Sequence, residues 1–230
     1  MIVSIHQPNF FPWLGYFEKI SRSDKFVFLD HVSATRTQAY LKRVEVLVCG
    51  KTKWSTIPLE KSTSSKKSII NRMKIKDNQR LLGKHINTLK QSYSKHPHFN
   101  EIFPLITDYH DMESSSISDR NINFIINVTN ELGFDIEFVK SSDLNLNTSS
   151  TDMLIEILSK VGGGTYLCGG GAQGYQEDWK FKIANINLLY QDFVPFTYCQ
   201  LGVDKFIPSL SIIDALMNIG FDGVRRILVR

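Results

Sequence analysis

The chain has 230 residues, of which 42% are hydrophobic and 22% are charged, and its formal net charge is +4. These values fit a single α/β domain (residues 1–230) with a packed core. They exclude a membrane-spanning protein, because no run approaches the roughly 18 apolar residues that a span requires. No signal-peptide pattern is present, and the three dispersed cysteines indicate neither a disulfide framework nor a metal site. We therefore expect a cytoplasmic protein.

The first thirty residues predict a βαβ unit. Ile2–Ile5 is a short apolar strand, and Lys25–Asp30 is a second one. Between them, the polar, proline-framed stretch His6–Trp13 leads into an apolar helix that begins near Leu14. A βαβ unit presents polar groups at the carboxyl edge of its sheet. We therefore expect a site where the first strand ends.

The loop after this strand carries the predicted site. Pro8 and Pro12 fix φ and remove two backbone donors, so the loop is predicted to be rigid. His6 is the expected proton-handling catalytic residue; the alternative is a structural histidine. The loop and helix also supply four predicted substrate-binding residues, Gln7, Asn9, Trp13 and Tyr16.

Asp30 and His31 end the second strand, so we expect the same edge of the sheet to present them near His6. A carboxylate beside a histidine orients the imidazole, and both residues are therefore predicted to be catalytic. The alternative is that Asp30 caps a following turn. Arg36 and Arg43 are candidates for binding a carboxylate or phosphate; the alternative for both is a solvated side chain.

Residues 44–59 predict a β-hairpin, with Val44–Val48 and Trp54–Leu59 on either side of a turn. Trp54 is expected to stack on a sugar or base, although aromatic residues more often fill the core. Basic residues gather in Lys61–Lys95. They form either a solvated surface or a binding surface for phosphate, on a nucleotide sugar or on RNA. Nothing in the pattern indicates DNA binding.

Residues 80–133 predict a helical insertion. Apolar residues recur there at helical spacing, first at Ile86, Leu89 and Tyr93, then at Ile122, Ile125, Ile126 and Thr129. Gly133 is predicted to end the second helix. Between the helices, His96 and His98 flank a proline without a nearby carboxylate or cysteine pattern, so we predict no metal site there.

The last hundred residues predict a second βαβ series. The expected strands are 136–139, 165–168 and 188–190, and the expected helices are 151–161, 175–184 and 209–218. The glycine-rich loop that follows residue 168 has the context of an anion-binding turn, or of a plain βα turn. Its predicted binding residues are Gly169, Gly170, Gly171 and Tyr175. Two βαβ halves around a helical insertion predict a mostly parallel sheet covered on both faces.

The opening HQPNFFPWLGYFEKI is similar to the signature of the WbqC-like proteins, which occur among bacterial O-antigen and surface-polysaccharide biosynthesis proteins. Weaker matches follow at LDHV (29–32), WSTIPL (54–59) and FIPSLSIID (206–214). This resemblance implies an amide-forming acyl or aminoacyl transferase or ligase of the glycyl type. Its expected substrate is a nucleotide-linked amino sugar.

The opening also looks like the start of the nucleotidylyltransferase and pantothenate-synthetase superfamily, which is Rossmann-like. There the first strand leads to a His-x-Gly-His element that binds ATP phosphates, whereas this chain has Trp13-x-Gly15-Tyr16. The comparison favours ATP as a cofactor. The acyl donor stays open between an adenylate, a charged tRNA and a thioester, and so does an oligomeric state.

Two other functions remain alternatives. One is a non-catalytic nucleotide-sugar binding or scaffolding protein of the same pathway, which the absence of a recognised nucleophile favours. The other is a different modification of the sugar, such as isomerisation.

Overall fold

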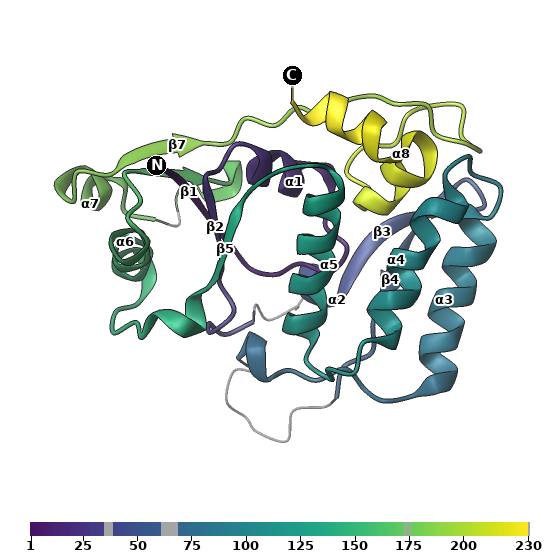
Figure 1. Cartoon of the computed structure of the whole chain (residues 1–230), viewed down its shortest axis with the longest axis horizontal. Helices are drawn as coiled ribbons and strands as arrows, with labels where there is room; N and C mark the ends of the chain where they lie inside the picture. Colours follow the sequence, from purple (N-terminus) through teal and green to yellow (C-terminus); the bar gives the residue numbers. More distant parts are fainter. Residues whose placement is uncertain (35–38, 61–68, 173, 175, 230) are drawn as a thin grey trace.

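The computed structural model describes residues 1–34, 39–60, 69–172, 174 and 176–229. Its centre is a parallel five-stranded sheet with the order β5-β2-β1-β6-β7 (Figure 1). The strands are β1 (Ile2–His6), β2 (Lys25–Phe28), β5 (Glu137–Lys140), β6 (Thr165–Cys168) and β7 (Asn187–Tyr190). The predicted Rossmann-like α/β fold is confirmed. β1 pairs in parallel with β2 on one side and with β6 on the other.

Each face of the sheet has its own core. Phe26 and Phe28 of β2 face a large core with α1 (Leu14–Ser21), α5 (Ile117–Glu131) and α8 (Ile212–Leu228). Val27, between them, faces a smaller core with α6 (Ser150–Val161) and α7 (Asp178–Ile183). Figure 1 shows α6 and α7 on the opposite side of the sheet from α5. Side chains alternate across a strand, so one apolar strand supplies both cores.

The strand order reverses at β1. The chain passes from β1 through α1 to β2 on one side, and β6 later pairs with β1 on the other side. In open α/β sheets, ligands bind outside the carboxyl ends of the strands at such a reversal. His6, the last residue of β1, lies at this position.

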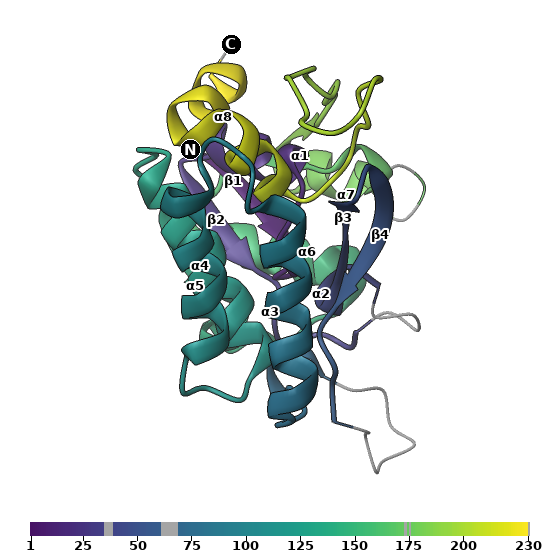
Figure 2. The same cartoon turned by 90° about the vertical axis from the view of Figure 1, so that its right-hand side faces the viewer.

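A hairpin and several helices lie between β2 and β5 in the chain. The hairpin consists of β3 (Arg43–Val48) and β4 (Lys51–Thr56), which confirms the predicted pairing. β4 begins earlier than predicted and ends before Pro58, which has no N–H for the ladder. Between β2 and β5 the chain also forms α2 (Ala39–Lys42), η1 (Ile70–Arg72), α3 (Gln79–Tyr93), α4 (Phe99–Asp111) and α5. Figure 2 shows α3 between α4 and the hairpin.

The predicted helices near the carboxyl terminus differ at their ends. α7 begins at Asp178 rather than at residue 175. α8 continues to Leu228, but its backbone breaks at Gly220, which has a φ of 65°. A side chain at Gly220 would also meet the imidazole of His98 at 2.6 Å. The expected end of this helix at Asn218 therefore falls close to the break. η2 (Ser141–Leu144) and η3 (Gly170–Ala172) complete the described elements.

Candidate functional site

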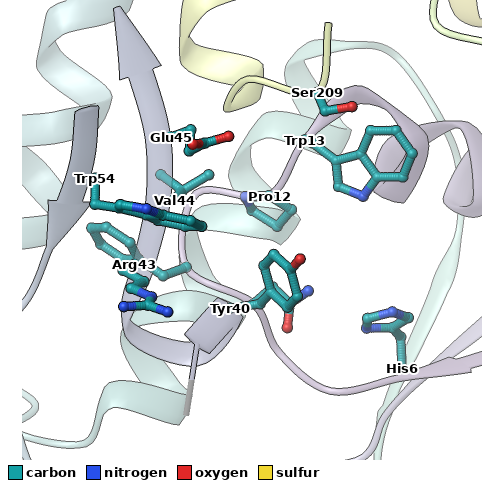
Figure 3. Close-up of a pocket in the computed structure, with 11 residues that line it drawn as sticks. His6, Pro12, Trp13, Tyr40, Arg43, Val44, Glu45, Trp54 and Ser209 are labelled. Atoms are coloured by element: carbon teal, nitrogen blue, oxygen red, sulfur yellow. The ribbon is translucent and has the colours of Figure 1, made fainter. Parts of the chain in front are cut away.

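A cavity of about 440 Å³ lies at the carboxyl end of β1 (Figure 3). Its walls come from β1, the loop of residues 7–13, α2, the hairpin and the segment before α8. The lining residues are His6, Asn9, Phe10, Pro12, Trp13, Tyr40, Arg43, Val44, Glu45, Trp54 and Ser209. The structure thus brings together five of the predicted site residues: His6, Asn9, Trp13, Arg43 and Trp54.

Hydrogen bonds from distant elements hold the loop of residues 7–13 in place. The fully buried amide of Asn121, on α5, donates to the carbonyl oxygens of Pro8 and Leu41, each at 2.9 Å. Its own oxygen accepts from the Tyr109 hydroxyl at 2.8 Å. The loop N–H of Phe10 donates to the Tyr40 carbonyl oxygen at 2.8 Å. One buried amide therefore fixes the loop to the segment that carries Tyr40 and Arg43.

The same loop contains a strained residue. Phe11 has a φ of 42°, a conformation that bulky side chains rarely adopt and that costs about 1–3 kcal/mol. Its ring is fully buried, with centroids 4.2 Å from Phe10 and 4.5 Å from Phe124. The Ser211 hydroxyl, at the start of α8, donates to its carbonyl oxygen at 2.8 Å. Packing therefore offsets the strain and keeps the loop in one shape.

His6 is a neutral imidazole with one ring nitrogen left unprotonated. Its Nδ1 lies 3.0 Å from the carbonyl oxygen of Gln7, which only accepts hydrogen bonds. Nδ1 therefore carries the hydrogen, and Nε2 keeps a free lone pair. Burial, and then the positive charge of Lys19, lower the pKa of His6 to about 3. At neutral pH the side chain is a proton acceptor without charge.

Two buried side chains of α1 support His6. Tyr16 packs edge-on against the imidazole, with centroids 4.8 Å apart, and donates from its hydroxyl to the Gln7 carbonyl oxygen at 3.0 Å. Lys19 is only 2% exposed, and its Nζ lies 3.4 Å from the carbonyl oxygen of Ile5. Burial lowers the pKa of Lys19 to about 7. Tyr16 was predicted to bind substrate, but its burial places it behind His6.

The opposite wall combines a cation, an aromatic ring and a carboxylate. The Arg43 guanidinium carbon lies 4.5 Å from the centre of the Trp54 ring. The Nε of Arg43 is buried and has no hydrogen-bond partner among the described residues. Glu45 pairs with Trp54 across the hairpin and shares this wall. Figure 3 shows Tyr40 between this wall and His6.

Trp13 depends on the glycine two residues later. A Cβ on Gly15 would approach the Trp13 ring to 2.5 Å. The other side of the ring meets Phe193 edge-on, with centroids 5.2 Å apart. Trp13-x-Gly15 is therefore a packing unit at the start of α1.

Asp30 and His31 do not line this cavity. The Asp30 carboxylate is 2% exposed and accepts hydrogen bonds from the Ser141 and Ser142 hydroxyls and from the Ser142 N–H, at 2.8–3.0 Å. His31 Nδ1 lies 2.6 Å from the Ser141 hydroxyl. The expectation that Asp30 or His31 stands behind His6 is therefore corrected. Asp30 instead caps the turn after β5, because its strand pairs with β5.

Three described residues of the glycine-rich loop, Gly169, Gly170 and Gly171, are not among the residues that line this cavity. Gly170 and Gly171 belong to η3 and are exposed, and Gly169 precedes it. α7 begins only at Asp178, so the loop does not lead directly into a helix. The predicted role of these glycines in binding therefore stays a prediction. Gln7 follows β1 but is also not among the lining residues.

Some of the predicted features lie outside the described residues. Arg36, Tyr175 and residues 61–68 lie outside. In the described part of Lys61–Lys95, the basic side chains are exposed.

Within residues 1–34, 39–60, 69–172, 174 and 176–229, no three His, Cys, Asp or Glu side chains gather to hold a metal ion. Across the same residues, no helix combines the length and apolar character needed to cross a bilayer.

Six lining residues had no place in the predicted site, and three of them carry polar groups: Tyr40, Glu45 and Ser209. Tyr40 and Glu45 precede and follow Arg43, and the period-two spacing of a strand could have indicated Glu45. Ser209 comes from the segment before α8, far away in sequence, and no local pattern indicates it. Trp13 and Ser211 form an isolated antiparallel β-bridge, which places that segment beside the cavity.

One comparison with known proteins identifies a family. The family model described as WbqC-like protein family matches residues 7–226. An uncharacterized protein of Mycobacterium tuberculosis, Rv1507c, is 26% identical over 223 residues, which cover 96% of this chain and 95% of that protein. The comparison with solved structures found no significant match.

Proposed function

The chain belongs to the WbqC-like protein family, and we propose that it forms an amide on a nucleotide-linked amino sugar for surface-polysaccharide synthesis. In this proposal the enzyme is an acyl or aminoacyl transferase or ligase of the glycyl type. The observation that carries it is the neutral His6, whose Nδ1 is held by Gln7. Its Nε2 is thereby left as a proton acceptor beside the cavity that His6 lines.

The wall opposite His6 suits a nucleotide. Trp54 offers a stacking surface for a base, and Arg43 offers N–H donors to phosphate oxygens. Glu45 supplies a carboxylate that accepts hydrogen bonds from sugar hydroxyls. A ligand that spans this wall and reaches His6 would bring its amine to the unprotonated nitrogen.

The chemistry that we propose is attack of the neutral sugar amine on an activated acyl carbon. The bond from that carbon to AMP, to the tRNA hydroxyl or to the thiol then breaks, and that group leaves. The amine nitrogen becomes much more acidic as its bond to carbon forms, so a weakly basic imidazole is able to take the proton at that stage. Asn9 lines the same cavity and offers amide N–H groups to the developing oxyanion. An anionic ligand beside His6 would also raise the pKa of its imidazole.

The acyl donor in this proposal is an adenylate made from ATP, a charged tRNA or a thioester. Mass spectrometry of uridine- and thymidine-diphosphate-linked amino sugars, each incubated with protein, glycine and ATP, tests it. The expected product is heavier by one glycyl group. Charged glycyl-tRNA and acyl thioesters replace glycine and ATP in parallel incubations. Absence of a product from every donor, despite measurable binding of a nucleotide sugar, would contradict an enzymatic role.

One observation favours the alternative of a non-catalytic nucleotide-sugar binding or scaffolding protein. Asp30 and His31 bond to Ser141 rather than to His6, so no carboxylate orients this imidazole among the described residues. A binding protein would saturate with nucleotide sugar in calorimetry and leave it chemically unchanged in the incubations above.

A further inference from the structure

A second cavity, of about 320 Å³, lies between the hairpin and α3. Ser55 of β4 and His85 of α3 both line it, and Lys53 and Lys84 flank them. The two lysine side chains are exposed, whereas Ser55 and His85 are buried, with 8% and 9% exposure. The cavity therefore has a cationic mouth above a buried serine and histidine.

The hairpin separates this cavity from the one that contains His6. Side chains alternate between the faces of a strand, so Lys53 and Ser55 point away from the face that carries Trp54. Arg43 and Glu45 share the face of Trp54 by their cross-strand pairing. Trp54 borders both cavities at the edge of the hairpin. Chemistry at the second cavity therefore does not depend on what the His6 cavity binds.

Ser55, His85 and His110 form a hydrogen-bonded chain. The Ser55 hydroxyl bonds to Nε2 of His85. Nδ1 of His85 lies 2.9 Å from Nε2 of His110, which is on α4. Nδ1 of His110 is buried and has no partner among the described residues, so the chain ends there. Burial keeps the pKa of His85 near 3 and that of His110 near 4, and both rings are neutral.

Ser55, His85 and His110 are arranged like a nucleophile, a base and a group that orients the base. When the serine hydroxyl donates to Nε2 of His85, Nδ1 of His85 carries a hydrogen and donates it to His110. His110 thereby holds the imidazole of His85 in the tautomer that accepts the serine proton. A buried two-histidine chain that ends in an unpaired nitrogen is costly as packing alone.

We propose that Ser55 is the nucleophile of a second site, which accepts an acyl group from an ester or thioester that carries an anionic group. Lys53 and Lys84 attract the anionic group to the mouth of the cavity.

The acylation of Ser55 needs no reagent other than the ester or thioester. Ser55 Oγ attacks the carbonyl carbon while its proton moves to Nε2 of His85. The bond from carbon to the leaving oxygen or sulfur then breaks, and the leaving group takes the proton from His85. The products are an ester on Ser55 and a free alcohol or thiol. Water or an amine releases the acyl group by the reverse use of the same base.

A biotin-linked fluorophosphonate, which reacts with activated serine hydroxyls, tests this proposal. We expect one adduct on native protein, located at Ser55 by peptide mass mapping, and none on heat-unfolded protein. Ser55→Ala should abolish the adduct, and His85→Gln should slow labelling by about 10²-fold or more. Ser92→Ala is the matched control, because the Ser92 hydroxyl on α3 donates to the backbone oxygen of Thr88 instead of a histidine.

Labelling at wild-type rate in Ser92→Ala supports the proposal. Native protein that takes no label, or takes it at another serine, overturns it, and so does a folded His85→Gln variant that reacts as fast as wild type. Should His85→Gln fail to fold, the comparison of native with unfolded wild type decides. Equal labelling of Ser55 in both states would then overturn the proposal.

Discussion

The Nδ1 atom of His6 lies 3.0 Å from the carbonyl oxygen of Gln7, the next residue in the chain. The Tyr16 hydroxyl donates to the same oxygen, also at 3.0 Å. A single carbonyl thus fixes the tautomer of the imidazole and ties it to α1. The backbone conformation of the loop after β1 therefore determines which ring nitrogen is available for chemistry.

The wall formed by Arg43 and Trp54 should determine the affinity for nucleotides. Trp54→Ala removes the ring on which we expect a base to stack, so binding should weaken by roughly 1–3 kcal/mol. Arg43→Lys keeps the charge but loses the planar contact with the ring, and it should weaken binding as well. Isothermal titration calorimetry with a nucleotide-linked amino sugar measures both effects.

Trp179→Ala is the matched control for Trp54→Ala. Trp179 is 58% exposed, similar to the 47% of Trp54, but it lies on α7 and not in the cavity. We expect its replacement to leave the affinity unchanged. Equal loss of affinity in the two variants would remove the basis for placing the nucleotide at Trp54.

Asn121 should stabilise the fold, because its amide holds the loop of residues 7–13 in place. Asn121→Ala leaves the carbonyl groups of Pro8 and Leu41 buried without donors. We expect the free energy of unfolding to fall by about 2–5 kcal/mol. Denaturant unfolding measures this loss. Asn127→Ala, which removes a partly exposed side chain on the same helix that bonds to Asn123, should change it by less than about 0.5 kcal/mol. A loss of similar size in both variants would contradict the anchoring role.

Lys19 should make the free energy of unfolding depend on pH above about pH 7. Its pKa falls from 10.5 in the unfolded chain to about 7 in the fold. Between these values the unfolded state binds more protons, so the free energy of unfolding rises with pH, by at most about 1.4 kcal/mol per unit. Below pH 7 this contribution is constant, and protonated Lys19 destabilises the fold.

Lys19→Met tests this linkage. The variant should lose the increase in stability between pH 7 and pH 9, which denaturant titrations at the two pH values measure. It should also raise the pKa of His6 in an NMR titration, because the positive charge of Lys19 lowers that pKa. If the stability of Lys19→Met rose with pH as much as that of wild type, the lowered pKa of Lys19 would be contradicted.

The sequence predicts the sheet well because its strands are short apolar runs that stand next to clear turn signals. α4 was not predicted as a separate helix, since Pro104 lies inside it and proline usually interrupts a helix. The beginning of α7 was placed too early, because a glycine-rich loop before a helix resembles an anion-binding turn.

The site was harder to predict than the sheet. His6, Asn9 and Trp13 belong to one local segment, and its prolines and polar residues indicate a site. Asp30 was misplaced because its partners on η2 are 111 and 112 positions away, and no spacing rule connects them. The contribution of Tyr40 and Glu45 depends on where the hairpin packs, which local patterns do not contain.

Turnover by His6 variants tests the central claim most directly. We compare wild type, His6→Ala and His6→Asn for glycyl addition to the nucleotide-linked amino sugar, and measure the melting temperature of each. Removal of a positioned proton acceptor should lower the rate roughly 10²–10⁴-fold, with a near-native melting temperature and no rescue by asparagine. A stable His6→Ala variant with near-wild-type turnover would contradict the account.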